Sequence, residues 1–75
     1  MDKNEFLANC ASQFDDTDPS EIQLDTKFHD LDEWSSIVGM TILAMAKVSY
    51  NKTISGEELK HCMTVEDVYN LINDK

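Results

Sequence analysis

The sequence predicts an all-α protein, a small four-helix bundle with a short third helix and a long first connection. Apolar residues recur at three- and four-residue steps in the segments expected to be helical. Two of these segments begin with a Ser or Thr followed three residues later by an acid, which is a helix-start signature. Turn-forming residues and a proline separate the first two. At 75 residues, the chain is expected to form a single domain over residues 1–75.

The first helix is expected over residues 3–14, where apolar side chains form one stripe. Acidic turn formers and Pro19 then stop it. The connection that follows runs to Glu33, and connections of this length are usually functional or anchored to the core. The stripe consists of Phe6, Leu7, Cys10, Ala11 and Phe14, and the expected anchors are Ile22, Leu24, Phe28 and Leu31.

The second helix is expected to begin near Ser36, to end at residue 49 or 50, and to be apolar almost all round. In so small a protein one helix cannot be buried on every side, and exposed apolar residues often mark a partner or ligand surface. The alternative is a central helix fully covered by the other three. Its apolar residues are Ile37, Val38, Met40, Ile42, Leu43, Ala44, Met45, Ala46 and Val48.

The third and fourth helices are predicted from their caps. Ser55 is followed three residues later by Glu58, and Thr64 is followed three residues later by Asp67, so both starts match a capping box. The third helix is short, and the fourth runs to about residue 73.

The net charge limits the possible partners. Fifteen acidic and six basic residues give a formal charge of −9. Nucleic acid binding needs clustered Lys and Arg, so this composition argues against it, and anionic membrane surfaces are disfavoured as well. Basic partner surfaces would be attracted. The alternative is that the acidity only maintains solubility.

The remaining composition favours a cytoplasmic protein. The N-terminus lacks the apolar core of a signal peptide, and the longest apolar stretch is too short to span a bilayer. Cys10 and Cys62 lie far apart without a CxxC pattern, and both fall on expected helix faces. We interpret them as buried small hydrophobes.

Metal binding and catalysis are both disfavoured. His29, His61 and the cysteines lack the paired spacing of a zinc site. A calcium loop fails because Glu21 occupies its glycine position and Lys27 its glutamate position. His29, seven residues before Ser36, could approach this serine, but no glycine-rich turn supplies an oxyanion hole. We therefore expect neither a metal site nor an enzyme.

The segment Trp34-Ser35-Ser36-Ile37 is the best candidate for a functional site. A serine at a helix start usually caps the helix, and one cap suffices. Two serines therefore leave one hydroxyl free to carry a group. A phosphodiester would be favoured there by the unpaired amides and the positive end of the helix. The alternative is that Ser36 is only a cap.

The chain around this serine resembles the acyl carrier protein family, whose motif reads roughly Phe-x-x-Leu-Gly-x-Asp-Ser-Leu. This chain has Phe28 and Leu31, and Ser36 falls on the attachment position. A family variant with Trp-Asp-Ser-Leu is closer to the Trp-Ser-Ser-Ile found here. Ser35 replaces the aspartate, and an acid stands where glycine is common. The order of long, long, short and medium helices also matches the family.

The resemblance implies a covalent cofactor. A phosphopantetheinyl transferase would move 4'-phosphopantetheine from coenzyme A to Ser36, and the thiol of this arm would hold an acyl group as a thioester. Ser35 and Trp34 would lie beside the attachment site, and we interpret Trp34 as a loop anchor rather than as a contact to the arm. Hydrophobic residues of the second and fourth helices would shelter the acyl tail. The chain itself would not be an enzyme.

The resemblance also implies partners, namely the transferase and acyl-loading or acyl-transfer enzymes with basic docking surfaces. It places Ile37 and Met40 on the exposed face beside the arm, with Ile42 and Leu43 turned inward. The docking residues expected from it are Asp30, Glu33, Ile37, Met40 and Glu57. The protein is expected to be a monomer.

The pathway is expected to be a specialised lipid, polyketide or other acyl-transfer pathway. Thr41 and Lys47 occupy positions of the second helix that are often acidic in the family. Two alternatives stay open. One is an aminoacyl or peptidyl carrier, although the Gly-Gly-x-Ser pattern common there is missing. The other is an unmodified acidic helical adaptor that binds partner proteins through its exposed apolar residues.

Overall fold

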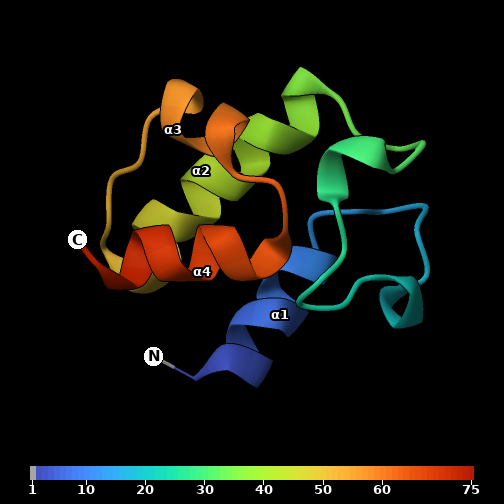
Figure 1. Ribbon diagram of the computed structural model, residues 1–75, viewed down its shortest axis with the longest axis horizontal. Helices are drawn as coiled ribbons and strands as arrows, with labels where there is room; N and C mark the ends of the chain where they lie inside the picture. The colour runs from blue at the N-terminus through green and yellow to red at the C-terminus, as the bar shows by residue number, and fades with distance from the viewer. Residues whose placement is uncertain (1) are drawn as a thin grey trace.

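The computed structural model describes residues 2–75 and contains four α-helices in this range (Figure 1). They are α1 (Lys3–Ala11), α2 (Ser36–Tyr50), α3 (Gly56–His61) and α4 (Val65–Asn73). Two short 3-10 helices, η1 (Pro19–Glu21) and η2 (Phe28–Asp30), lie in the connection between α1 and α2. The predicted all-α bundle, with a short third helix and a long first connection, is confirmed.

The helix starts follow the predicted caps. α2 begins at Ser36, and it ends at Tyr50, where Asn51 adopts the left-handed conformation (φ 55°). The capping boxes predicted at Ser55 and Thr64 are both present. These starts could be predicted because each depends on side chains within a few residues of the helix.

The end of α1 was predicted too late. The helix stops at Ala11 rather than at Phe14. The Ser12 hydroxyl donates to the carbonyl of Asn9 at 2.7 Å, and the Gln13 side-chain amide donates to the same carbonyl at 3.1 Å. After the helix the chain forms a tighter turn, in which the Phe14 amide donates a hydrogen bond to the Ala11 carbonyl three residues earlier. Phe14 is nevertheless buried, as its place in the apolar stripe predicted.

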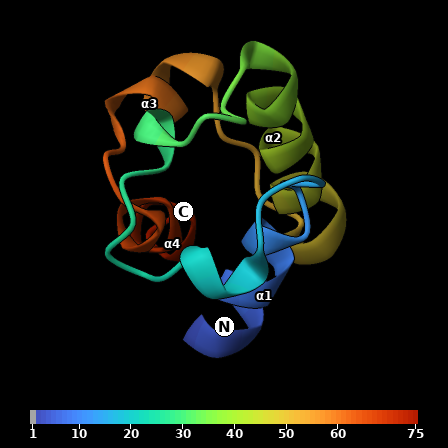
Figure 2. The same ribbon diagram turned by 90° about the vertical axis from the view of Figure 1, so that its right-hand side faces the viewer.

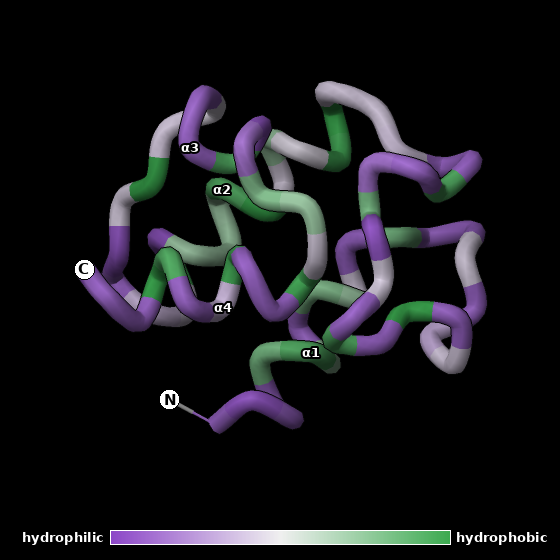
Figure 3. Tube along the Cα trace, viewed as in Figure 1, coloured by the Kyte–Doolittle hydropathy of each residue, from purple (hydrophilic) through white to green (hydrophobic). Residues whose placement is uncertain are grey.

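The core is shared by helices and connection. Hydrophobic residues run along most of α2, whereas α4 alternates between hydrophobic and hydrophilic residues (Figure 3). Ile22 and Phe28 are each 1% exposed, and Leu24 and Leu31 pack partly buried against the same core. The prediction that apolar residues anchor the long connection is therefore confirmed. The largest fully buried side chains are Phe6, Ile22, Phe28, Val68 and Ile72.

The long connection is also bonded to the start of α4, beside which it passes (Figure 2). The Val65 amide donates to the Thr26 carbonyl at 3.3 Å, and the Glu66 amide donates to the Leu24 carbonyl at 2.9 Å. The first amides of a helix have no partner within the helix. At α4 the connection supplies these partners, so two segments far apart in the sequence stabilise each other.

Salt should stabilise the fold. The chain has fifteen acidic and only six basic residues. Within residues 2–75 the Lys–carboxylate ion pairs are Lys3–Glu66 at 3.0 Å and Lys75–Glu58 at 2.9 Å. Most carboxylates therefore repel one another, and salt screens this repulsion. We expect the thermal midpoint, measured by circular dichroism, to rise from low to moderate ionic strength. A flat or falling midpoint would show that local pairing already balances the charge.

Candidate functional site

The two consecutive serines differ in their roles at the start of α2. Ser35 is the N-cap: its backbone is extended, and its hydroxyl accepts a hydrogen bond from the Val38 amide at 3.3 Å. Ser36 is the first helical residue and is exposed. Across the part of the chain that the structure describes, no hydrogen bond engages the Ser36 hydroxyl. One serine caps the helix, and the other presents a free hydroxyl to solvent.

The backbone amides at this helix start are open too. Within residues 2–75 the amides of Ser36 and Ile37 have no hydrogen-bond partner, unlike those of Val65 and Glu66 at the start of α4. Open amides and the positive end of the helix dipole both favour an anion. A phosphodiester on Ser36 would lie where α2 stabilises negative charge.

Trp34 holds the segment that leads into α2. Its amide donates to the Leu31 carbonyl at 3.0 Å. Its ring lies edge-on to Phe28 at 5.1 Å and to His29 at 4.6 Å between centroids, with Phe14 at 6.4 Å. Aromatic pairs at such distances stabilise beyond their buried area. Trp34 is therefore a loop anchor that fixes the approach to the two serines.

The position of Trp34 against α2 depends on Gly39. A Cβ built on Gly39 would lie 3.3 Å from Cη2 of Trp34 and 3.7 Å from Cδ2 of Leu59. The first distance is tighter than ordinary van der Waals contact, so a side chain here would push the indole away. Gly39 does not have a positive φ, and the sequence contains no turn signal that would have singled it out.

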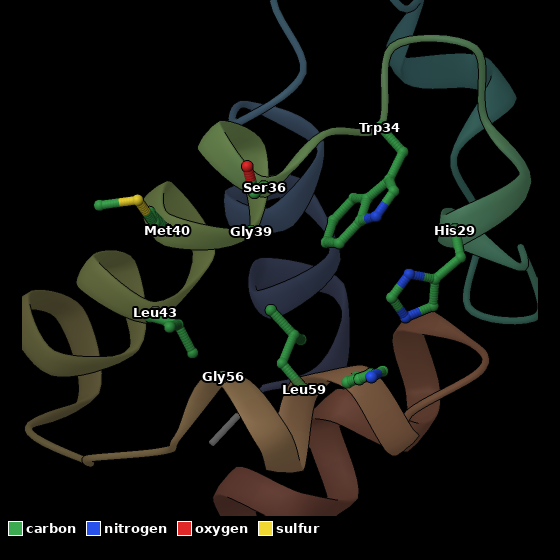
Figure 4. A pocket seen from close by; sticks show the side chains of 9 residues that line it. His29, Trp34, Ser36, Gly39, Met40, Leu43, Gly56 and Leu59 are labelled. Atoms are coloured by element: carbon green, nitrogen blue, oxygen red, sulfur yellow. The ribbon is translucent and has the colours of Figure 1, made fainter.

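A pocket of about 460 Å³ opens beside Ser36 (Figure 4). Its walls come from α2, α3 and the segment that precedes α2. The second helix lines this space as expected, but no described lining residue of this pocket belongs to α4, the other helix that was expected to line it. That helix packs against α1, while α3 packs against α2. The lining residues are His29, Trp34, Ser36, Gly39, Met40, Leu43, Gly56, Leu59 and Lys60.

The facing of α2 was predicted correctly at three of four positions. Ile37 and Met40 are 71% and 67% exposed, and Ile42 is buried at 3%. Leu43 is partly buried: it packs against the core and also lines the pocket, so its predicted inward orientation is confirmed only in part. One residue rotates a helix by about 100°, which places Leu43 at the edge of the core, where it also borders the pocket. Val48, at 85% exposed, extends the apolar surface.

Comparison with known proteins decides the family. A model of the phosphopantetheine attachment site family matches residues 5–72. An acyl carrier protein of Kocuria rhizophila is 35% identical over 75 positions, which cover 96% of this chain and 93% of that protein. The chain belongs to the acyl carrier protein family. No solved structure gives a significant match.

As an acyl carrier protein, the chain is a carrier and not an enzyme, and the cofactor of its family is 4'-phosphopantetheine. The start of α2 fits this group. The exposed Ser36 hydroxyl could bear the phosphodiester, the open amides of Ser36 and Ile37 favour its charge, and the adjoining pocket offers apolar surface.

The acids expected to face the carrier's partners lie on three different elements. Asp30 ends η2 and Glu57 lies in α3, and both are exposed. Glu33 precedes α2, and its carboxylate accepts hydrogen bonds from the Thr17 hydroxyl at 2.7 Å and the Asp16 amide at 3.0 Å. The Thr17 hydrogen bond is the largest cause that lowers the pKa of Glu33. Glu33 therefore holds the connection in place besides adding negative charge.

The carrier's cysteines belong to its core. Both are free and buried, as expected of small hydrophobes. Burial raises the pKa of Cys10 to about 12 and also raises the pKa of Cys62. Neither is therefore an activated thiolate.

Residues 2–75 contain neither a group of side chains suited to a metal ion nor a helix suited to crossing a membrane. No three or more His, Cys, Asp or Glu side chains are grouped so that they could hold a metal ion. Among the described helices, none has both the length and the apolar character needed to cross a bilayer.

Proposed function

We propose that this chain carries an acyl group as a thioester on a 4'-phosphopantetheine arm attached to Ser36, in a specialised lipid, polyketide-type or other acyl-transfer pathway of the cytoplasm. The observation that carries the proposal is the free, exposed Ser36 hydroxyl at the open N-terminus of α2. Ser35 already caps the helix, so modification of Ser36 removes no hydrogen bond from the fold. Trp34 and Ser35 position the attachment site.

The attachment itself would be performed by a phosphopantetheinyl transferase. A base of that enzyme takes the proton of the Ser36 hydroxyl, and Oγ attacks the phosphorus that bears the pantetheine in coenzyme A. The bond from that phosphorus to the nucleotide breaks, and adenosine 3',5'-bisphosphate leaves. This chain contributes an accessible oxygen on a rigid helix start and open amides that favour the product's charge.

Intact mass spectrometry tests the site. After incubation with coenzyme A and a broad-specificity transferase, the wild type should gain one phosphopantetheine unit. Ser36→Ala should abolish the gain and melt like the wild type, since Ser36 makes no capping bond. Ser35→Ala should still be modified but lose about 1 kcal/mol of stability with its cap. Modification of Ser35→Ala at a residue other than Ser36, or loading of Ser36→Ala, would contradict the assignment.

The proposed partners are the transferase and acyl-loading or acyl-transfer enzymes that meet a monomer of this chain. Ile37 and Met40 would provide the apolar centre of the docking surface, because both are exposed next to Ser36. Asp30, Glu33 and Glu57 would attract basic residues around it, which mainly accelerates association.

A second candidate is an unmodified adaptor that binds partner proteins through the exposed apolar residues of α2. It becomes the better hypothesis if several transferases leave the wild-type mass unchanged. An aminoacyl or peptidyl carrier would be modified at the same serine, and the group found on the arm in cells would identify it.

A further inference from the structure

We infer that the pocket beside Ser36 accepts an acyl chain that carries an oxygen substituent, and that His29 forms a hydrogen bond to this oxygen. His29 would then determine specificity for an oxygenated rather than a purely hydrocarbon cargo. This inference rests on the proposed function, because the chain reaches the pocket through an arm on Ser36.

The first observation is an unsatisfied polar atom. Nε2 of His29 is buried and has no hydrogen-bond partner among the described residues. The imidazole contacts both Phe28, at 4.4 Å between centroids, and Trp34, at 4.6 Å, and these two rings also contact each other at 5.1 Å. Buried polar atoms are nearly always paired, because an unpaired one loses its water without compensation. A partner for His29 would therefore stabilise the protein.

The second observation is the place of this ring. His29 lines the pocket together with Ser36. Figure 4 shows the ring edge that carries the nitrogen atoms turned toward the space between Trp34 and α3. A half-turn about the Cβ–Cγ bond leaves the ring outline nearly unchanged and exchanges Nε2 with Cε1. The nitrogen can thus be presented to a ligand without displacing the rings that hold it.

The third observation is the chemistry of the other walls. Met40, Leu43 and Leu59 are hydrophobic, so the body of the occupant should be apolar. The arm itself carries amide and hydroxyl groups, which would lose their water against these walls without finding partners. A saturated chain would satisfy the walls but leave Nε2 of His29 unpaired. An apolar chain with one oxygen would contact the hydrophobic walls and would also form a hydrogen bond with Nε2 of His29.

The experiment compares acyl chains of equal length on the loaded protein. One chain is saturated, and the others carry a single hydroxyl at successive positions, since a hydroxyl both donates and accepts. The rate of thioester hydrolysis measures how well the pocket shelters each chain. At the best position, the hydroxyl should slow hydrolysis about three- to tenfold, which is the range of one hydrogen bond. The ¹⁵N resonance of His29 Nε2 should shift with this chain and not with the saturated one.

The matched variant is His29→Phe, which keeps an aromatic ring in contact with Phe28 and Trp34 but removes the nitrogens. It should abolish the preference for the hydroxylated chain. His61→Phe, which makes the same change at an exposed histidine outside the pocket lining, should leave the preference intact. If His29→Phe does not fold, the nitrogen resonance of the wild type decides.

Three results would overturn the inference. They are equal hydrolysis at every hydroxyl position, a preference that survives in His29→Phe, and a His29 resonance that the hydroxylated chain does not move. The mass gain at Ser36 is measured first on each protein. A wild type that cannot be loaded contradicts the proposed function, whereas a loaded protein without the preference contradicts only the role of His29.

Discussion

Ile42→Ala should unfold the protein or bring it close to unfolding, whereas Met40→Ala should melt almost like the wild type. Ile42 is 3% exposed, and truncating such a side chain costs about 2–5 kcal/mol through lost burial and the cavity left behind. A domain this small has little stability to lose. Met40 is 67% exposed, and surface substitutions usually stay within about 0.5 kcal/mol.

Circular dichroism melting of the two variants side by side checks this expectation. If Met40→Ala is the more damaging, the facing of α2 is wrong and the proposed docking surface falls with it. In transfer assays with a partner enzyme, Met40→Ala should be slower than the wild type. Val48→Ala is the matched control, because Val48 is also exposed but lies about 18 Å further along α2 than Ser36. Equal slowing by both variants would argue against a surface centred on Ser36.

Trp34→Ala should have the second large effect, with a loss of about 3 kcal/mol, the lower end for truncating a large aromatic residue, because Trp34 is only partly buried. The rings of Phe14, Phe28 and His29 would lose their common neighbour. The segment before Ser36 would then be released, and the transferase should modify Ser36 more slowly.

Trp34→Phe keeps an aromatic ring, so it should recover most of the lost stability and most of the lost rate of Ser36 modification. Urea unfolding measures the stability, and the rate of mass gain measures the presentation of Ser36. A Trp34→Ala protein that is modified at the wild-type rate would show that the indole stabilises the fold without positioning the serine.

What could be predicted from the sequence depended on short-range signals. The caps Ser35, Ser55 and Thr64 act on amides three residues away, so the starts of three helices were recognisable. The exposure of Ile37 and Met40 followed from the resemblance to carrier proteins and agrees with the structure.

The features that escaped prediction depend on contacts between distant segments. The bonds from Val65 and Glu66 to the long connection join backbone groups, which leave no trace in side-chain patterns. Gly39 matters only because Trp34 packs on it, and Leu43 is less buried than predicted because it borders the pocket between α2 and α3. The orphaned nitrogen of His29 is likewise visible only once the rings around it are placed.

Trp34 is the single tryptophan of the chain, and it forms one wall of the pocket beside Ser36. Indole fluorescence depends on the polarity around the ring, and this ring is only partly buried. A chain that enters the pocket would replace water at the indole and move its emission to shorter wavelength. The native, unlabelled protein therefore contains an optical reporter of whether its cargo is sheltered or released, so the exchange of cargo with a partner enzyme could be followed by stopped-flow fluorescence.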